Sequence, residues 1–110
     1  MRRVVLETRL AGEVERNLRY ARLAMLDCLR RGEAPFASHL LYPQCLDDLK
    51  PEERKLGMEA GFAWGDVAEA TVVYDDFGVS NGMGEGIDRA LAAKRPVEFR
   101  QLPTELMALL

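Results

Sequence analysis

The sequence has few of the residues that usually build metal sites or disulfide frameworks, with only two cysteines and one histidine among 110 residues. Cys28 and Cys45 are too few to predict a disulfide framework, so we expect two free thiols. A zinc site needs three or four ligands, and one histidine with two unclustered cysteines does not supply them. We therefore expect neither a metal nor another cofactor.

Long apolar stretches are also missing. No segment approaches the roughly 18 consecutive apolar residues that a membrane-spanning helix requires. The apolar run after Arg2 and Arg3 is shorter than the apolar region of a signal peptide, which is roughly 7–15 residues long. We therefore expect a cytoplasmic protein that does not act at a membrane.

Positive charge is not in excess, because the formal net charge is −3 and the pI is about 5.2. A nucleic-acid polymer as the main partner would require a concentrated basic face. The 48% hydrophobic and 30% charged residues instead indicate one domain, residues 1–110, that can bury a core.

Residues 70–97 carry the clearest pattern in the chain. Residues 71–74 form a β-branched and aromatic run that is typical of a buried strand. A turn is predicted next, because glycine allows backbone conformations that other residues resist. The glycines of this predicted turn are Gly78, Gly82, Gly84 and Gly86. A stripe of apolar residues with helical spacing then continues to Leu91, and Pro96 ends that helix.

The rest of the chain repeats the alternation of strand and helix. Strands are predicted at residues 3–7, 34–38 and 97–102, and helices at residues 13–31 and 51–67. The last eight residues form an amphipathic tail, which either docks as a final helical turn or pairs with another subunit. This order predicts a three-layer α/β fold, in which about four parallel strands carry helices on both faces.

Ligands of open parallel sheets lie beyond the carboxyl ends of the strands, so we searched these ends for polar and glycine-rich segments. The first candidate loop, residues 8–12, follows the first strand, and His39 follows the second. Residues 75–85 follow the third strand. The candidate ligand contacts are Arg9, Leu10, Gly12, His39, Arg54, Ser80, Asn81, Gly82 and Met83.

Several of these candidates also have a structural interpretation. His39 is placed to hydrogen-bond a base or a phosphate, or to tie its loop to the neighbouring helix. Arg54 either carries charge to a ligand or pairs with Asp47, Asp48 or Glu7. Trp64 either stacks on a base or, with the glycines at 57, 61 and 65, builds a packed helix interface.

Several short motifs follow one another over nearly the whole chain. They are Leu-Ala-Gly at 10–12, Asn17, Pro35, Ser-His-Leu-Leu-Tyr-Pro-Gln at 38–44, Pro-Glu-Glu-Arg-x-x-Gly at 51–57, Gly-Val-Ser-Asn-Gly-Met at 78–83 and Arg-Pro-Val at 95–97. In this order the motifs resemble those of the nucleoside 2-deoxyribosyltransferase-like families, especially their small phage and bacterial members.

This resemblance implies a flavodoxin-like or Rossmann-like fold and a homo-oligomer that binds a nucleoside or nucleotide. It also implies a place in the cytosol of a bacterium or of a phage-infected host. In the characterised enzymes, a glutamate at the start of the third helix attacks the anomeric carbon of the deoxyribose and displaces the base. Glu85 is the corresponding nucleophile candidate, and Asp75 or Asp76 is the candidate for an acid or an orienting group.

Glu85 departs from the family motif, in which the glutamate lies two residues before a glycine. Here Glu85 immediately precedes Gly86, and a shift of one residue rotates a helical side chain by about 100°. Three hypotheses follow: an enzyme that cleaves or transfers an N-glycosidic bond, a non-catalytic protein that sequesters a nucleotide signal, and an assembly module. In the second and third, Glu85 only complements a helix N-terminus and the aspartates cap a turn.

Overall fold

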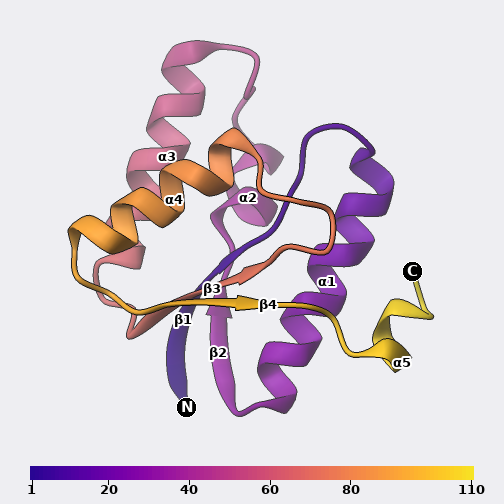
Figure 1. Cartoon of the computed structure of the whole chain (residues 1–110). Helices are drawn as coiled ribbons and strands as arrows, with labels where there is room; N and C mark the ends of the chain where they lie inside the picture. The colour runs from indigo at the N-terminus through magenta and orange to yellow at the C-terminus, as the bar shows by residue number, and fades with distance from the viewer.

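The sheet of the computed structural model, which describes all residues 1–110, has four parallel strands in the order β2-β1-β3-β4 (Figure 1). The strands are β1 (Arg2–Glu7), β2 (Glu33–Phe36), β3 (Ala70–Tyr74) and β4 (Val97–Arg100). Each pair of neighbours is parallel, with Val4 of β1 opposite both Pro35 and Ala70. The predicted four-stranded parallel sheet is therefore confirmed.

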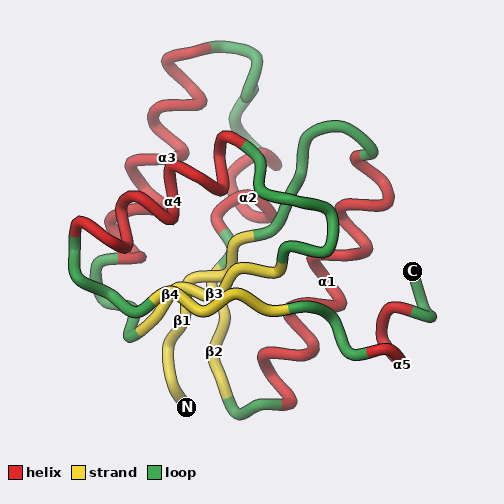
Figure 2. Tube along the Cα trace, in the orientation of Figure 1, coloured by secondary structure: helices red, strands yellow, loops and turns green.

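Helices cover both faces of this sheet, as the colouring by secondary structure shows (Figure 2). The helical elements are α1 (Val14–Arg30), α2 (Ser38–Leu41), the 3₁₀ helix η1 (Tyr42–Gln44), α3 (Pro51–Gly65), α4 (Asn81–Ala92) and α5 (Thr104–Met107). In Figure 1, α1 and α5 lie on one side of the sheet and α3 and α4 on the other. The three-layer, Rossmann-like α/β arrangement agrees with the prediction. None of these helices combines the length and apolarity needed to cross a bilayer.

The alternation of side chains along β1 separates the core from the opposite face. Val4 and Leu6 are buried in the core cluster with Tyr20 and Ala24 of α1. Successive strand residues point to opposite faces, so Val5 and Glu7 face α3 and α4 instead. The core thus fills the α1 side, and the other side of the sheet carries a charged residue at the end of β1.

A buried ion pair joins the two edge strands. Arg100 of β4 donates to both carboxylate oxygens of Glu33 of β2, at 2.7 Å in each case, and both side chains are less than a tenth exposed. The hydrogen bond from Arg100 holds the pKa of Glu33 below its usual value. Tyr74 extends this network, since its hydroxyl donates to Asp27 at 2.6 Å.

The structure corrects the predicted turn after β3. Gly78 alone among its four glycines has a positive φ, +83°, whereas the other three, at positions 82, 84 and 86, lie within α4. The helix begins early because Ser80 is its N-cap, with its Oγ accepting a hydrogen bond from the Met83 amide at 3.3 Å.

Two smaller differences concern the second strand and the tail. The predicted strand at 34–38 ends at Phe36, and Ser38–Leu41 forms the short helix α2. The amphipathic tail docks as α5, with Leu106 only 2% exposed in the core. Docking against the same chain was one of the two roles expected for this tail.

Candidate functional site

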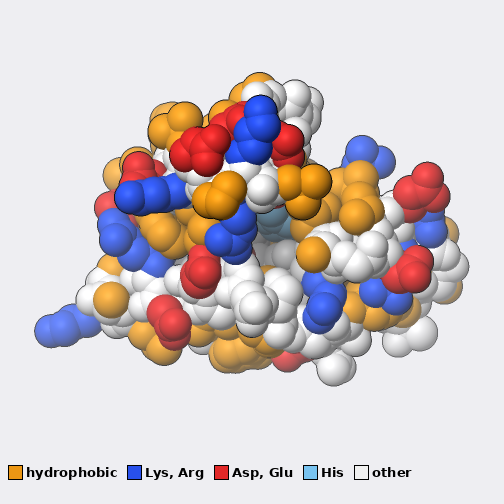
Figure 3. All heavy atoms as spheres, turned by 90° about the horizontal axis from the view of Figure 1, so that it is seen from above, with side chains coloured by type: hydrophobic (Ala, Val, Ile, Leu, Met, Phe, Trp, Pro, Cys, Tyr) orange, Lys and Arg blue, Asp and Glu red, His pale blue; other side chains and the backbone are white.

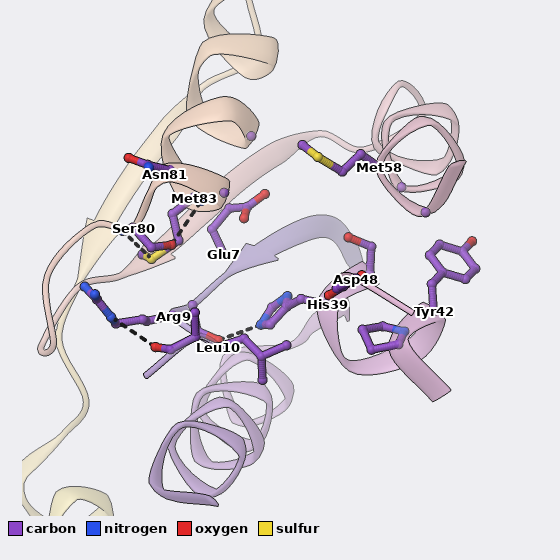
Figure 4. Close-up of a pocket in the computed structure, with 18 of the residues that line it drawn as sticks. Glu7, Arg9, Leu10, His39, Tyr42, Asp48, Met58, Ser80, Asn81 and Met83 are labelled. Carbon is purple, nitrogen blue, oxygen red and sulfur yellow. Dashed lines mark hydrogen bonds between the residues drawn. The ribbon is translucent and has the colours of Figure 1, made fainter. Parts of the chain in front are cut away.

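A cleft of about 740 Å³ lies at the carboxyl ends of β1, β2 and β3. Its walls come from the loop after β1, from α2 and the loop that follows it, from α3 and from the first turns of α4 (Figure 4). Seen from above, the molecule is hollowed, and the ring of its single histidine is visible at the bottom of the hollow (Figure 3). The cleft therefore lies where the strand order predicts a ligand.

Most residues expected to contact a ligand line this cleft. They are Arg9, Leu10, His39, Arg54, Ser80, Asn81, Gly82 and Met83. Gly12 does not line it, although its φ of +100° shapes the loop that carries Arg9 and Leu10. The structure thus brings together segments that lie far apart in the sequence, as the prediction requires.

The three carboxylates expected to be catalytic do not line the cleft. Asp76 accepts hydrogen bonds from the Tyr20 hydroxyl and from the Leu102 amide, so its carboxylate joins α1 to the segment after β4. Asp75 uses its backbone amide to bond the carbonyl of Arg100. Glu85 is exposed on α4, with a carboxylate oxygen 3.7 Å from a guanidinium nitrogen of Arg54. These residues therefore do not form the expected catalytic group in the cleft.

Glu7, at the end of β1, supplies the carboxyl group that faces the cleft instead. Its side chain lies against Gly86 of α4, and a β-carbon added to that glycine would be 2.6 Å from Glu7 Cδ. Burial raises the pKa of Glu7 to about 8, although the positive charge of Arg95 acts in the opposite direction. The carboxyl is therefore largely protonated at neutral pH.

Arg95 is the cation that acts on Glu7, but its own hydrogen bonds are directed elsewhere. Its guanidinium donates to Thr71 Oγ1 at 3.1 Å and to the carbonyl of Gly65 at 2.8 Å. Arg95 is only 9% exposed and lines the floor of the cleft. In the sequence this arginine appears only within the Arg-Pro-Val motif at 95–97, and no ligand contact was predicted for it.

His39 lies on α2 and projects into the same space as Glu7 (Figure 4). One ring nitrogen, Nε2, is 2.6 Å from Thr8 Oγ1. Burial lowers the pKa of His39 to about 4, so the ring is uncharged at neutral pH. His39 both ties α2 to the end of β1 and lines the cleft, and its two interpretations are therefore compatible.

The loop after β1 is held by Asn17 of α1. The Asn17 amide group is fully buried and donates to the carbonyls of Leu10 and Ala11 at 3.0 and 3.1 Å. Arg9 then reaches across to the carbonyl of Phe77 at 3.4 Å. These bonds fix the loop after β1 beside the loop that leads into α4.

The first turn of α4 presents free amides and nearby cations to the cleft. Ser80 caps the Met83 amide, which leaves the amides of Asn81 and Gly82 without partners inside the helix. A guanidinium nitrogen of Arg54 lies 3.9 Å from the position of a β-carbon on Gly82. Amides at a helix N-terminus together with a cation favour an anion.

The wall formed by α3 combines close packing with apolar side chains. A β-carbon on Gly61 would lie 2.8 Å from Ser38 Cβ, which confirms that the glycine face of α3 allows a close approach to α2. Met58 and Phe62 line the cleft from α3. Trp64 is 61% exposed and its ring lies 6.2 Å from that of Phe36, so it packs on the outside and does not line the cleft.

Comparison with protein families identifies the family of this chain. A family profile described as a domain of unknown function (DUF7768) matches residues 2–100. A search of curated proteins found no match to the chain. The profile covers all four strands and every segment that lines the cleft. The chain is therefore a member of the DUF7768 family of domains of unknown function.

Proposed function

We propose that the cleft binds a nucleoside 5′-monophosphate, or a closely related nucleoside or nucleotide, in the cytoplasm. The observation that carries this proposal is the convergence of three strand ends on one cleft with an anion-attracting end and an apolar wall. The cleft volume of about 740 Å³ falls within the range of small-molecule sites.

The phosphate is assigned to the first turn of α4. Two amides without helical partners point from this turn, and the guanidinium groups of Arg54 and Arg9 lie beside Gly82 and Gly78. Phosphate oxygens accept hydrogen bonds from such amides and pair with arginine in a bidentate way. Few neutral ligands would use this combination.

The base is assigned to the side of the cleft near α3. Leu10 and Val14 approach from the β1 and α1 side, and Met58 and Phe62 approach from α3. The apolar faces of a nucleobase gain free energy when such side chains remove them from water. Resemblance to nucleoside 2-deoxyribosyltransferase-like proteins supports the same ligand class.

Binding without catalysis, as in a protein that sequesters a nucleotide signal, accounts for the position of Glu85 outside the cleft. Cleavage of the N-glycosidic bond is the second candidate, and one observation favours it. Glu7 places a carboxyl with a raised pKa inside the cleft, which is the property of a general acid at neutral pH.

Thermal unfolding with a panel of ribo- and deoxyribonucleoside monophosphates tests the proposal. A ligand that binds only the folded protein raises Tm, and the rise grows with the ratio of its concentration to its Kd. We expect a rise with at least one monophosphate and a smaller rise with the matching nucleoside. No rise with any member of the panel would overturn the proposal. Release of free base in the same samples would select the catalytic candidate.

We also propose that the protein is a homo-oligomer. Leu91 on α4 and Phe99 on β4 are each more than half exposed, as is Trp64 on α3. Assembly through such residues would remove apolar surface from water. Light scattering coupled to size-exclusion chromatography measures the mass directly, and a monomer at micromolar concentration would contradict this part of the proposal.

A further inference from the structure

Glu7 is an acidic group for which the folded protein provides no hydrogen-bond donor. No protein group donates a hydrogen bond to its carboxyl. Every fully buried side-chain polar atom of the protein has a partner, so the unpartnered oxygens of Glu7 are open to the cleft (Figure 4). A carboxyl in this position can receive hydrogen bonds only from water or from a ligand that enters the cleft. A ligand in the cleft would supply the missing hydrogen bonds.

The surroundings of Glu7 offer no ion pair that would explain its position. Arg95, from the segment between α4 and β4, directs its hydrogen bonds to Thr71 and Gly65. His39 of α2 is uncharged at neutral pH, and α4 presents Gly86. The remaining charged groups of the cleft are Arg9 after β1, Asp48 before α3 and Arg54 on α3. None of them forms a salt bridge with Glu7 at 4.0 Å or less.

The distance along α4 assigns a role to this carboxyl. Glu7 touches α4 at Gly86, whereas the free amides belong to Asn81 and Gly82. Four or five residues of helix correspond to about 6–7.5 Å along the axis. This spacing is comparable to that between the phosphate and the sugar hydroxyls of a nucleoside 5′-monophosphate.

We propose that Glu7 contacts the ligand directly and hydrogen-bonds the sugar hydroxyls of a nucleoside 5′-monophosphate whose phosphate lies at the start of α4. The inference rests on the proposed nucleotide site and adds to it the part of the ligand that the end of β1 recognises. A carboxyl group that is largely protonated both donates and accepts, which suits a hydroxyl group. It also avoids placing a second negative charge beside the phosphate.

The test is a set of binding isotherms with AMP, 2′-deoxy-AMP and 2′,3′-dideoxy-AMP at pH 7, measured by calorimetry for three proteins. Glu7→Leu keeps the approximate size of the side chain and removes both hydrogen-bonding functions. Glu7→Gln is the matched control, because an amide also donates and accepts. Thermal unfolding of each variant verifies that it is folded.

For the unmodified protein, we expect about tenfold weaker binding of the dideoxy ligand than of AMP. Glu7→Leu should bind AMP about tenfold more weakly and should no longer discriminate among the three ligands. Glu7→Gln should keep the discrimination and bind AMP within a few-fold of the unmodified protein. The loss of discrimination in one variant alone is a readout that a merely structural role would not produce.

Two results would overturn the inference, and they are distinguishable. If the unmodified protein binds none of these nucleotides, nor any monophosphate in the wider panel, the nucleotide site itself is wrong and the role of Glu7 is lost with it. If the unmodified protein binds and discriminates, but Glu7→Leu discriminates equally well, the nucleotide site stands and Glu7 does not contact the sugar.

Discussion

The carboxyl of Glu7 occupies the space that a β-carbon at position 86 would need, so the end of β1 lies against the second turn of α4 where that helix has a glycine. A β-carbon there would lie 2.6 Å from Glu7 Cδ. Both residues line the cleft, so this contact forms part of its wall.

This contact predicts opposite effects for two similar substitutions in α4. Alanine is preferred to glycine inside helices by about 1 kcal/mol, so Gly84→Ala, with no atom within 4 Å of its new β-carbon, should stabilise the protein by up to that amount. Gly86→Ala should instead destabilise it slightly, by less than about 1 kcal/mol, because the new methyl group must displace the flexible end of the Glu7 side chain. Urea unfolding measures both variants. Equal stabilisation by the two substitutions would show that Glu7 does not occupy this space.

The pKa of Glu7 predicts how stability changes with pH. Its pKa is about 8 in the folded protein and 4.5 for an ordinary glutamate, so the folded state holds this proton more tightly than the unfolded state. The stabilisation is complete below pH 4.5 and is lost as the pH rises through 8. The slope cannot exceed about 1.4 kcal/mol per pH unit for one group. Glu7→Gln should flatten the decrease in unfolding free energy between pH 6.5 and 8, and an unchanged decrease would exclude Glu7 as its cause.

The lowered pKa of His39 predicts that stability changes in the opposite direction with pH in the acidic range. Its folded pKa is about 4, below the usual 6.5, so stability from the neutral ring is present above pH 6.5 and is lost as the pH falls through 4. Between pH 4.5 and 6.5 this trend opposes that of Glu7. His39→Gln should therefore reveal a steeper gain of stability on acidification in this window. Urea unfolding at several pH values measures the difference, and identical profiles would contradict a buried neutral ring.

The pair formed by Arg100 and Glu33 predicts a large loss of stability when one partner is removed. Arg100→Met leaves the buried Glu33 carboxylate with only the longer contact to Arg2, at 3.4 Å, so we expect a cost of up to about 3 kcal/mol. The double variant Arg100→Met with Glu33→Gln should recover part of the loss, because no uncompensated charge remains. If the two single variants and the double variant are additive, the buried pair does not couple the edge strands.

Arg54 and Glu85 predict different effects on ligand binding. Arg54 lines the cleft beside the first turn of α4, whereas Glu85 does not line it. Arg54→Gln should weaken the binding of a nucleoside monophosphate by about tenfold and leave a nucleoside without phosphate nearly unaffected. Glu85→Gln should leave both within a few-fold. A loss of binding with Glu85→Gln would return this residue to the site.

The alternation of strands and helices and the residues at the strand ends could be read from the sequence. Thr71 to Tyr74 formed a buried strand as predicted, and the ordering rules of parallel sheets placed Arg9, His39 and Ser80 around one cleft. These predictions succeeded because hydrophobic periodicity and strand direction are properties of short segments and of chain order.

The errors arose where contacts between distant segments decide the outcome. Glycines at 82, 84 and 86 suggested a turn, but Ser80 caps the helix before them and they lie within α4. In the sequence, Glu7 suggested only an ion pair with Arg54, although its position on the first strand also indicates which face of the sheet it occupies. It follows Val5 by two positions on a central strand, so it faces the same covered side of the sheet.

The bond between Glu33 and Arg100 also bears on when the chain becomes stable during its synthesis. A ribosome-bound chain that has exposed β1 to α4 but still holds residues 97–100 in the exit tunnel leaves Glu33 paired with Arg2 alone, without its bidentate partner. Such a chain also lacks one edge of the sheet. Because Leu102 and Leu106 of the core follow β4, the domain reaches its native stability only after β4 and α5 have emerged.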